Sequence, residues 1–171
     1  MGPQAAVNLT DLLEQSRQEV VESVAGVTEL QAAVRPDPAR WSVLECVEHV
    51  TAAEERFLKF LEDAGRVEEP QIRPEKQATI SEAILDRGRR AQAPPPVQPA
   101  GRFASLTVAM EAFQTIRDRS VRFAQERGGD LDLLTAQHPR FGPVSGREFM
   151  FIIAGHARRH AAQIREIRGS L

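Results

Sequence analysis

The sequence contains one cysteine, Cys46, and no long apolar run. A single cysteine excludes an internal disulfide and a cysteine-rich zinc site, and it suits a reducing compartment such as the cytoplasm. No apolar stretch approaches the roughly 20 residues that a membrane span requires, and the amino terminus lacks a basic region followed by an apolar core. We therefore expect a cytoplasmic protein with neither a membrane anchor nor a signal peptide.

An excess of positive charge is also missing. Lys and Arg total 22 against 24 for Asp and Glu, and the formal net charge is −2. Basic residues alternate with acidic ones, as in Arg117-Asp118-Arg119, and do not form the one-sided stripe that phosphate binding requires. The sequence thus argues against a nucleic-acid partner, and a small-molecule substrate is expected instead.

The length of 171 residues suits one domain with a single hydrophobic core, so we expect one domain over residues 1–171. Ser42 with Glu45, and Ser145 with Glu148, have the spacing of a capping box, which predicts two helix starts. Apolar residues recur at helical spacing in four long segments. The expected helices are 9–34, 43–63, 106–127 and 146–167.

The region 66–101 is rich in proline, which excludes one long helix there. Within it we expect a short helix over 79–90 and an extended polyproline segment at Pro94-Pro95-Pro96. Residues 131–144 are expected to form a loop, because no segment alternates apolar and polar residues as a strand does. The predicted fold class is all-α, a four-helix bundle with a long crossover connection.

Two histidines stand four residues apart in His156-Ala157-Arg158-Arg159-His160. On a helix they project from one face about one turn apart, where both imidazoles can bind one metal ion. The apolar segment 149–155 before them indicates that this part of the helix is buried. Hydrogen-bonded or surface histidines also occur at this spacing, so the pair alone leaves both interpretations open.

Two separate motifs resemble those of the DinB/YfiT-like superfamily of small bacterial metalloproteins. The first is Trp41-Ser42-Val43-Leu44-Glu45-Cys46-Val47-Glu48-His49-Val50. The second is His138-Pro139-Arg140-Phe141-Gly142-Pro143-Val144-Ser145, followed by Glu148, Phe149 and the segment His156-Ala157-Arg158-Arg159-His160-Ala161-Ala162-Gln163-Ile164. The resemblance covers nearly the whole chain and implies a divalent metal ion, Zn or Ni, inside the bundle. The implied ligands are His49, His156 and His160, with water completing the coordination.

Three imidazoles with open coordination positions suit a catalytic metal, since a closed structural zinc normally has four protein ligands. Such an ion can lower the pKa of a bound water or thiol and polarise a substrate carbonyl. The glutamate of His-Glu-x-x-His proteases is absent, because Ala157 follows His156. No catalytic side chain is assigned, and imidazole ligands alone do not select among Zn, Ni, Cu and Fe.

Three polar residues are candidates to orient a ligand or contact a substrate. Glu45 lies one turn before His49 and could accept a hydrogen bond from its ring, although helix capping is its expected role. Glu48 is the adjacent alternative. Gln163 follows His160 by three residues and is placed to hydrogen-bond a ligand or substrate, with packing as its alternative role.

Three further residues have a structural role as the favoured interpretation. His138 could line the mouth of the site, but it precedes a proline and is expected to order its loop. Trp41 could cover a pocket, but it stands directly before a helix N-cap and is expected to act as a hydrophobic staple. Cys46 could be a soft metal ligand, and we expect a small core residue.

The resemblance implies a metal-dependent enzyme related to bacillithiol transferases and mycothiol-dependent isomerases. A thiol or water activated by the metal would then act in transfer or hydrolysis, with a low-molecular-weight thiol as a partner. The alternatives are a non-catalytic metal-binding or stress-response protein, and a helical domain without metal. A homodimer paired through a helix face is compatible with the sequence, which shows no unambiguous interface.

Overall fold

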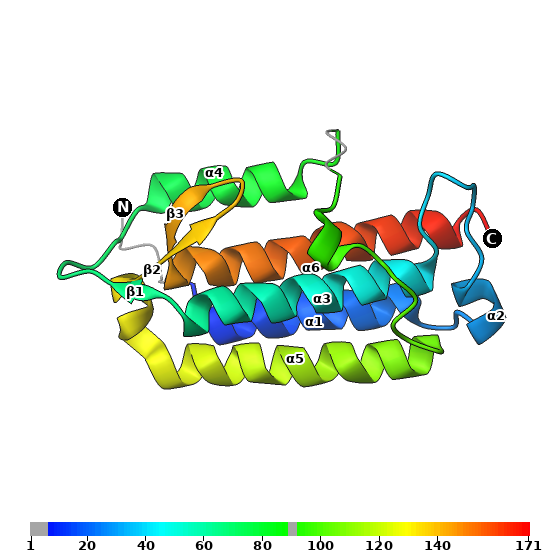
Figure 1. The fold of residues 1–171 in the computed structure, drawn as a ribbon, viewed down its shortest axis with the longest axis horizontal. Coiled ribbons are helices and arrows are strands. Elements are labelled where there is room, and N and C mark those ends of the chain that lie inside the picture. Colours follow the sequence, from blue (N-terminus) through cyan, green and yellow to red (C-terminus); the bar gives the residue numbers. More distant parts are fainter. Residues whose placement is uncertain (1–6, 89–91) are drawn as a thin grey trace.

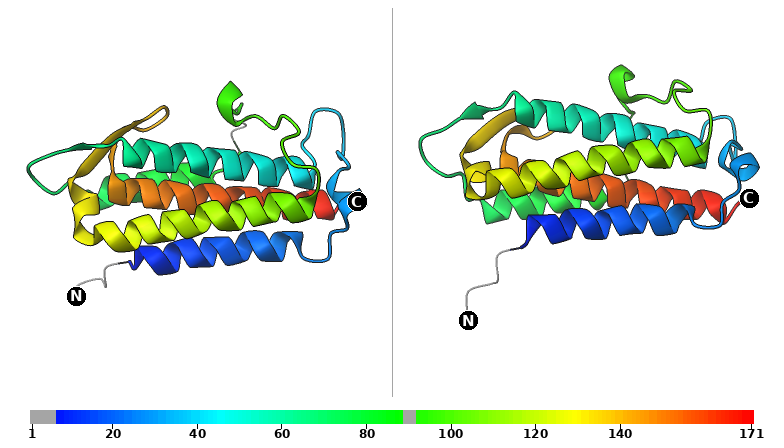
Figure 2. Two further views of the ribbon diagram at one scale, coloured as in Figure 1. Left: turned by 60° about the horizontal axis from the view of Figure 1, so that its bottom comes forward. Right: turned by 90° about the horizontal axis from the view of Figure 1, so that it is seen from below.

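Four long helices form the body of the molecule in the computed structural model, which describes residues 7–88 and 92–171. The helices lie side by side along one axis (Figures 1 and 2). They are α1 (Leu9–Val24), α3 (Val43–Glu62), α5 (Leu106–Arg127) and α6 (Gly146–Arg168). Both α3 and α1 pack against α5 and α6. The expected all-α bundle with a long crossover is confirmed, and no helix of the described residues is long and apolar enough to cross a bilayer.

Local side-chain chemistry fixes where the long helices begin. Ser42 Oγ accepts a hydrogen bond from Glu45 N at 3.1 Å, and Glu45 Oε2 accepts one from Ser42 N at 2.8 Å. Ser145 and Glu148 make the same reciprocal pair at the start of α6. Each box satisfies amides that have no partner within the helix, so both expected starts are confirmed.

The expected first helix over 9–34 is wrong, because the chain leaves α1 after Val24. Gly26 has φ +77°, in the left-handed region that a glycine adopts without steric cost. Thr28 then caps a separate short helix, α2 (Glu29–Ala32), through a capping box with Gln31. A second start signal within the apolar pattern thus divides it into two helices.

The expected loop over 131–144 is also wrong. Its residues form the 3₁₀ helix η2 (Gly128–Leu133) and the hairpin strands β2 (Leu134–His138) and β3 (Gly142–Ser145). A third strand, β1 (Gly65–Arg66), pairs antiparallel with β2. The expected helix over 43–63 ends at Glu62 with Asp63 as its cap, and Gly65 begins β1. Strands of two to five residues are too short to show an alternating pattern.

The crossover between α3 and α5 carries a helix that packs on α6. This helix, α4 (Pro74–Leu85), begins earlier than the expected residue 79, because proline is well tolerated at the first helical position. It ends at Leu85, before the expected residue 90, which itself lies outside the described residues. The proline run does not stay extended: Pro95–Val97 form one 3₁₀ turn, η1, in which Val97 N donates to Pro94 O at 3.0 Å.

A buried ion pair joins three of the four long helices. Arg117 of α5 is 0% exposed, and its guanidinium binds both carboxylate oxygens of Glu54 on α3 at 2.8 and 2.9 Å. Its third nitrogen donates to Leu13 O and Ser16 Oγ on α1 at 2.6 Å each. The pair therefore has its hydrogen-bonding groups satisfied, and losing one partner leaves a charge without compensation in the core.

Replacing Glu54 by Ala is expected to lower the free energy of unfolding by about 3–5 kcal/mol, because Arg117 is then buried and unpaired. A matched control is Glu62→Ala, which removes the partner of the exposed Arg119 between the same two helices. That change is expected to cost at most about 1 kcal/mol. Urea denaturation measures both values, and similar small losses in the two variants would contradict this account of the core.

Candidate metal centre

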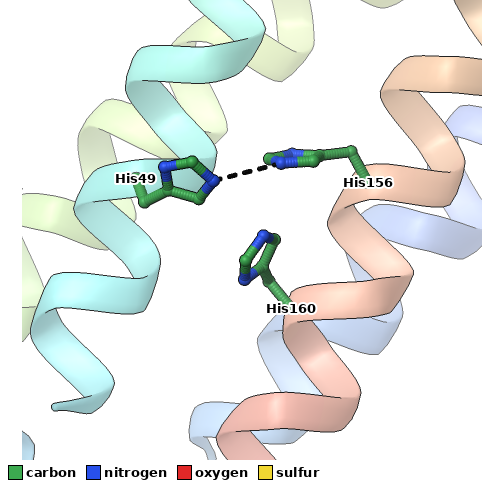
Figure 3. A group of neighbouring side chains, drawn as sticks. All are labelled: His49, His156 and His160. Atoms are coloured by element: carbon green, nitrogen blue, oxygen red, sulfur yellow. Dashed lines mark hydrogen bonds between the residues drawn. The ribbon is translucent and has the colours of Figure 1, made fainter. Parts of the chain in front are cut away.

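Three imidazoles point toward one another between α3 and α6 (Figure 3). His49 lies on α3, and His156 and His160 lie one turn apart on α6. Their donor nitrogens all lie within 4.8 Å of one another, and His49 Nε2 and His156 Nε2 are 3.1 Å apart. Two nitrogens bound to one tetrahedral zinc at about 2.0–2.1 Å stand roughly 3.3 Å apart, so this pair has the separation that a shared ion requires.

The outer nitrogens of two of these rings have acceptors. His49 Nδ1 lies 2.7 Å from Val97 O, and His160 Nδ1 lies 2.8 Å from Gln163 Oε1. Because a carbonyl oxygen only accepts, Nδ1 of each ring donates and Nε2 keeps its lone pair toward the centre. Metal-binding histidines are commonly oriented in this way. Of the two roles considered for Gln163, the structure shows the hydrogen bond to a ring of the cluster.

The surroundings of the cluster keep its imidazoles neutral. Burial lowers the pKa of His49. Burial, together with repulsion among the three rings, holds the pKa values of His156 and His160 well below the usual value. Neutral imidazole is the form that binds a metal ion. His156 keeps part of its surface exposed, whereas His49 and His160 are buried.

The crossover supplies the acceptor for His49 through residues 94–102, here called the strap. Glu48, which is buried on α3, accepts hydrogen bonds from Ala100 N at 2.6 Å and from Arg102 N at 3.1 Å. These two bonds fix the strap to α3 at the residue before His49. Val97 of the strap then accepts a hydrogen bond from the His49 ring through its backbone oxygen. Sequence reasoning missed this contact because a backbone carbonyl has no signature in the sequence.

Trp41 lies against the histidine cluster. Its ring centroid is 4.8 Å from that of His49 and 6.2 Å from that of His160. The same side chain packs on the core cluster that contains Cys46. The staple interpretation was therefore incomplete, since Trp41 both packs beside the start of α3 and forms a wall of the candidate site.

Glu45 and Glu48 do not orient the rings directly. The Glu45 carboxylate accepts from Ser42 N and pairs with Arg35, at 3.1 and 2.9 Å from Arg35 Nε. Its expected capping role is confirmed, and the orienting role is taken by Val97 O. Glu48 reaches His49 only through the strap.

Cys46 and His138 lie outside the cluster. Cys46 is fully buried in the core, and burial raises the pKa of its thiol to about 12. His138 Nδ1 accepts from Arg140 N at 3.1 Å and Phe141 N at 3.3 Å, which confirms its loop-ordering role. The Phe57 ring, 5.5 Å from His138 and 5.7 Å from His156, packs against both. Neither Cys46 nor His138 belongs to the group of converging donors found among the described residues.

Comparison with known proteins agrees with this fold. Residues 12–164 match the family model of the DinB superfamily. The chain belongs to the DinB superfamily. It is 23% identical over 158 residues to the uncharacterized protein YuaE of Bacillus subtilis, covering 92% of this chain and 95% of that protein.

A solved structure extends the comparison of the fold. YfiT from Bacillus subtilis, described as a probable metal-dependent hydrolase with an unusual four-helix bundle topology, aligns with a TM-score of 0.56 and 18% identity. The alignment covers 99% of this chain and 92% of YfiT. The expected family resemblance is confirmed, and the likeness to YfiT shows that the two chains share a fold.

Tryptophan fluorescence is expected to report binding at the cluster, because Trp41 is the only tryptophan and the chain has no tyrosine. An equimolar amount of Ni²⁺ should quench the emission, since the Trp41 ring lies 4.8 Å from His49. The measurement is a fluorescence titration, with His160→Ala as the variant that should lose the response. Unchanged emission from protein that has bound its nickel would place the ion elsewhere.

Glu48→Gln is expected to weaken metal affinity about tenfold, because an amide can accept from only one of the two strap N–H groups and turns a donor toward the other. A matched control is Glu62→Gln on the same helix, since Glu62 pairs with the exposed Arg119 of α5 and does not contact the strap. That variant should bind metal as the wild type does. Competition with a chelating dye measures the affinities, and equal values for the two variants would exclude a role for the strap.

Proposed function

We propose that this chain is a metal-dependent enzyme in which His49, His156 and His160 hold one divalent ion, Zn or Ni. The nucleophile would be water or a small thiol, and its target a small-molecule electrophile. The proposal rests on the convergence of three neutral imidazoles, of which His156 is partly exposed. Three protein ligands leave coordination positions for a nucleophile and a substrate, as in catalytic zinc sites.

The chain's own residues position the donors and bound the site. Val97 O and Gln163 Oε1 hold the protons on the outer nitrogens of His49 and His160, which keeps both rings in one orientation. Trp41 closes one side. A bound divalent ion would supply Lewis-acid activation, lowering the pKa of the nucleophile and polarising the electrophile. Because no carboxylate of the described residues belongs to the converging donors, we assign no protein general base.

A thiol nucleophile must come from solution. Cys46 is the only cysteine, it is fully buried, and the pKa of its thiol is raised to about 12, so it is neither accessible nor ionised near neutral pH. Thiol transfer therefore requires a low-molecular-weight thiol, which a cytoplasmic location would provide. Hydrolysis requires only water, and the description of YfiT as a probable metal-dependent hydrolase supports it as the second reaction of the same site.

Metal analysis of protein purified without a histidine tag tests the first half of the proposal. We expect roughly one Zn or Ni per chain, lost on changing His49, His156 or His160 to Ala. His138→Asn is the matched control, because the asparagine Oδ1 can replace the Nδ1 acceptor and the remaining three histidines are unchanged. A well-folded wild type that takes up no ion from Zn²⁺ or Ni²⁺ solution would refute the metal site.

Turnover by the metal-loaded protein tests the second half. The assays are hydrolysis of p-nitrophenyl acetate and of simple amides, and conjugation of cysteamine or cysteine to chlorodinitrobenzene. At least one reaction should be abolished by chelation and in His160→Ala, and kept in His138→Asn. A protein that binds its metal and turns over neither class of substrate would support the alternative, a non-catalytic metal-binding protein.

A further inference from the structure

Beside the histidine cluster, Arg87 has a nitrogen without a partner. Arg87 follows the end of α4, and its Nη2 pairs with Glu166 Oε2 of α6 at 2.5 Å. Its Nη1 is buried and makes no hydrogen bond to the described residues. A buried guanidinium N–H without an acceptor is costly, so Nη1 marks a position at which an acceptor is missing.

Arg159 brings a second positive charge to the same place. It directly precedes His160, and its guanidinium donates to the carbonyls of Ile84 and Asp86, at the end of α4 and just beyond it. On α6, residues 159, 163 and 166 are spaced four and three apart and form one stripe. Along this stripe, Arg159 and Glu166 lie on either side of Gln163. Gln163 is hydrogen-bonded to His160, and Glu166 is paired with Arg87.

Arg87, which is paired with Glu166, and Arg159 both bring positive charge to the cluster. Both Arg87 and Arg159 lower the pKa of His160, and Arg159 also lowers that of His156. Among the described residues, no carboxylate contributes to the shifted pKa of any of the three histidines. Three neutral imidazoles also leave both charges of a divalent ion uncompensated. The site therefore favours a group that brings negative charge.

We propose that the substrate carries an oxyanion group, a carboxylate or a phosphate, which Arg87 binds through Nη1 beside Arg159. This inference rests on the proposed function, because it assumes that the reacting part of the substrate lies at the three histidines. The planar guanidinium fits either oxyanion, and the pair with Glu166 holds it in place. Arg87 is a substrate-binding residue in this arrangement and contributes nothing to metal ligation.

Isothermal titration of the zinc-loaded protein tests the inference with three probes. Inorganic phosphate and succinate represent the two oxyanions, and succinamide is the uncharged counterpart of succinate. We expect the wild type to bind at least one oxyanion and to bind succinamide at least about tenfold more weakly. The stronger of the two oxyanions identifies the chemistry of the natural group.

Three variants locate the binding. Arg87→Gln should raise the Kd of the oxyanion about tenfold or more, and Arg87→Lys should raise it by a smaller factor, because lysine keeps the charge without the planar fork. The matched control is Arg158→Gln, since Arg158 is an arginine of α6 that pairs with Glu19 of α1. It should keep the wild-type Kd. Zinc content should be the same in all four proteins.

Two results would overturn the inference. One is an oxyanion Kd that is equal in the wild type, Arg87→Gln and Arg87→Lys, which would show that the anion binds the metal alone or another site. The other is zinc-loaded wild type that binds no oxyanion, or binds succinamide as well as succinate. Both outcomes leave the metal site intact, whereas a failure of the proposed function appears earlier, as wild-type protein that takes up no zinc.

Discussion

The contact between α3 and α6 is the constraint on which the candidate site depends. One helix carries His49 and the other carries His156 and His160, so the donors converge only while these helices keep their register. Two capping boxes, at Ser42 and Ser145, fix where the helices begin and therefore the turn on which each histidine lies. The helices also pack directly on each other, and the Arg117–Glu54 pair joins α3 to α5.

The crossover contributes more to the site than its irregular sequence indicates. Its final part forms the strap, which brings Val97 O to the ring of His49 and is fixed to α3 by Glu48. Its middle part is α4, which lies along α6 (Figure 1). Just beyond the end of α4, Arg87 pairs with Glu166. The crossover thus orients the His49 ring through Val97 and brings the guanidinium of Arg87 to the histidine cluster. Burial, the neighbouring rings and the guanidinium groups of Arg87 and Arg159 together lower the pKa values of the imidazoles and keep them neutral.

Local chemistry explains which features the sequence could predict. Ser42, Ser105 and Ser145 mark helix starts because their hydroxyls bind amides only three residues away. His156 and His160 share a face because of the helical period alone, whereas placing His49 with them required the family resemblance. The apolar pattern over 9–34 does not show the end of α1, because that end depends on Gly26 in the left-handed region and on the competing start at Thr28. The hairpin was missed because its strands are too short for a pattern.

The other features that the sequence does not predict are contacts between residues far apart in the chain. The acceptor for His49 is a backbone carbonyl 48 residues away, and the acceptor for Arg117 lies on another helix 63 residues away. Neither has a sequence signature, because each depends on how the helices pack. Trp41 was read from its local position before an N-cap, and its second role against the rings appears only once α6 is placed beside α3.

X-ray absorption at the metal edge tests the central claim most directly, because it identifies the ligand atoms of a bound ion without requiring a substrate. Protein purified without a histidine tag and loaded with Zn²⁺ should show imidazole nitrogen scattering at about 2.0–2.1 Å, with roughly three imidazoles per ion and the remaining positions filled by oxygen. The same spectrum should show no sulfur at about 2.3 Å. A sulfur ligand, or a shell of oxygen without imidazole, would contradict the assignment of His49, His156 and His160 as the metal centre.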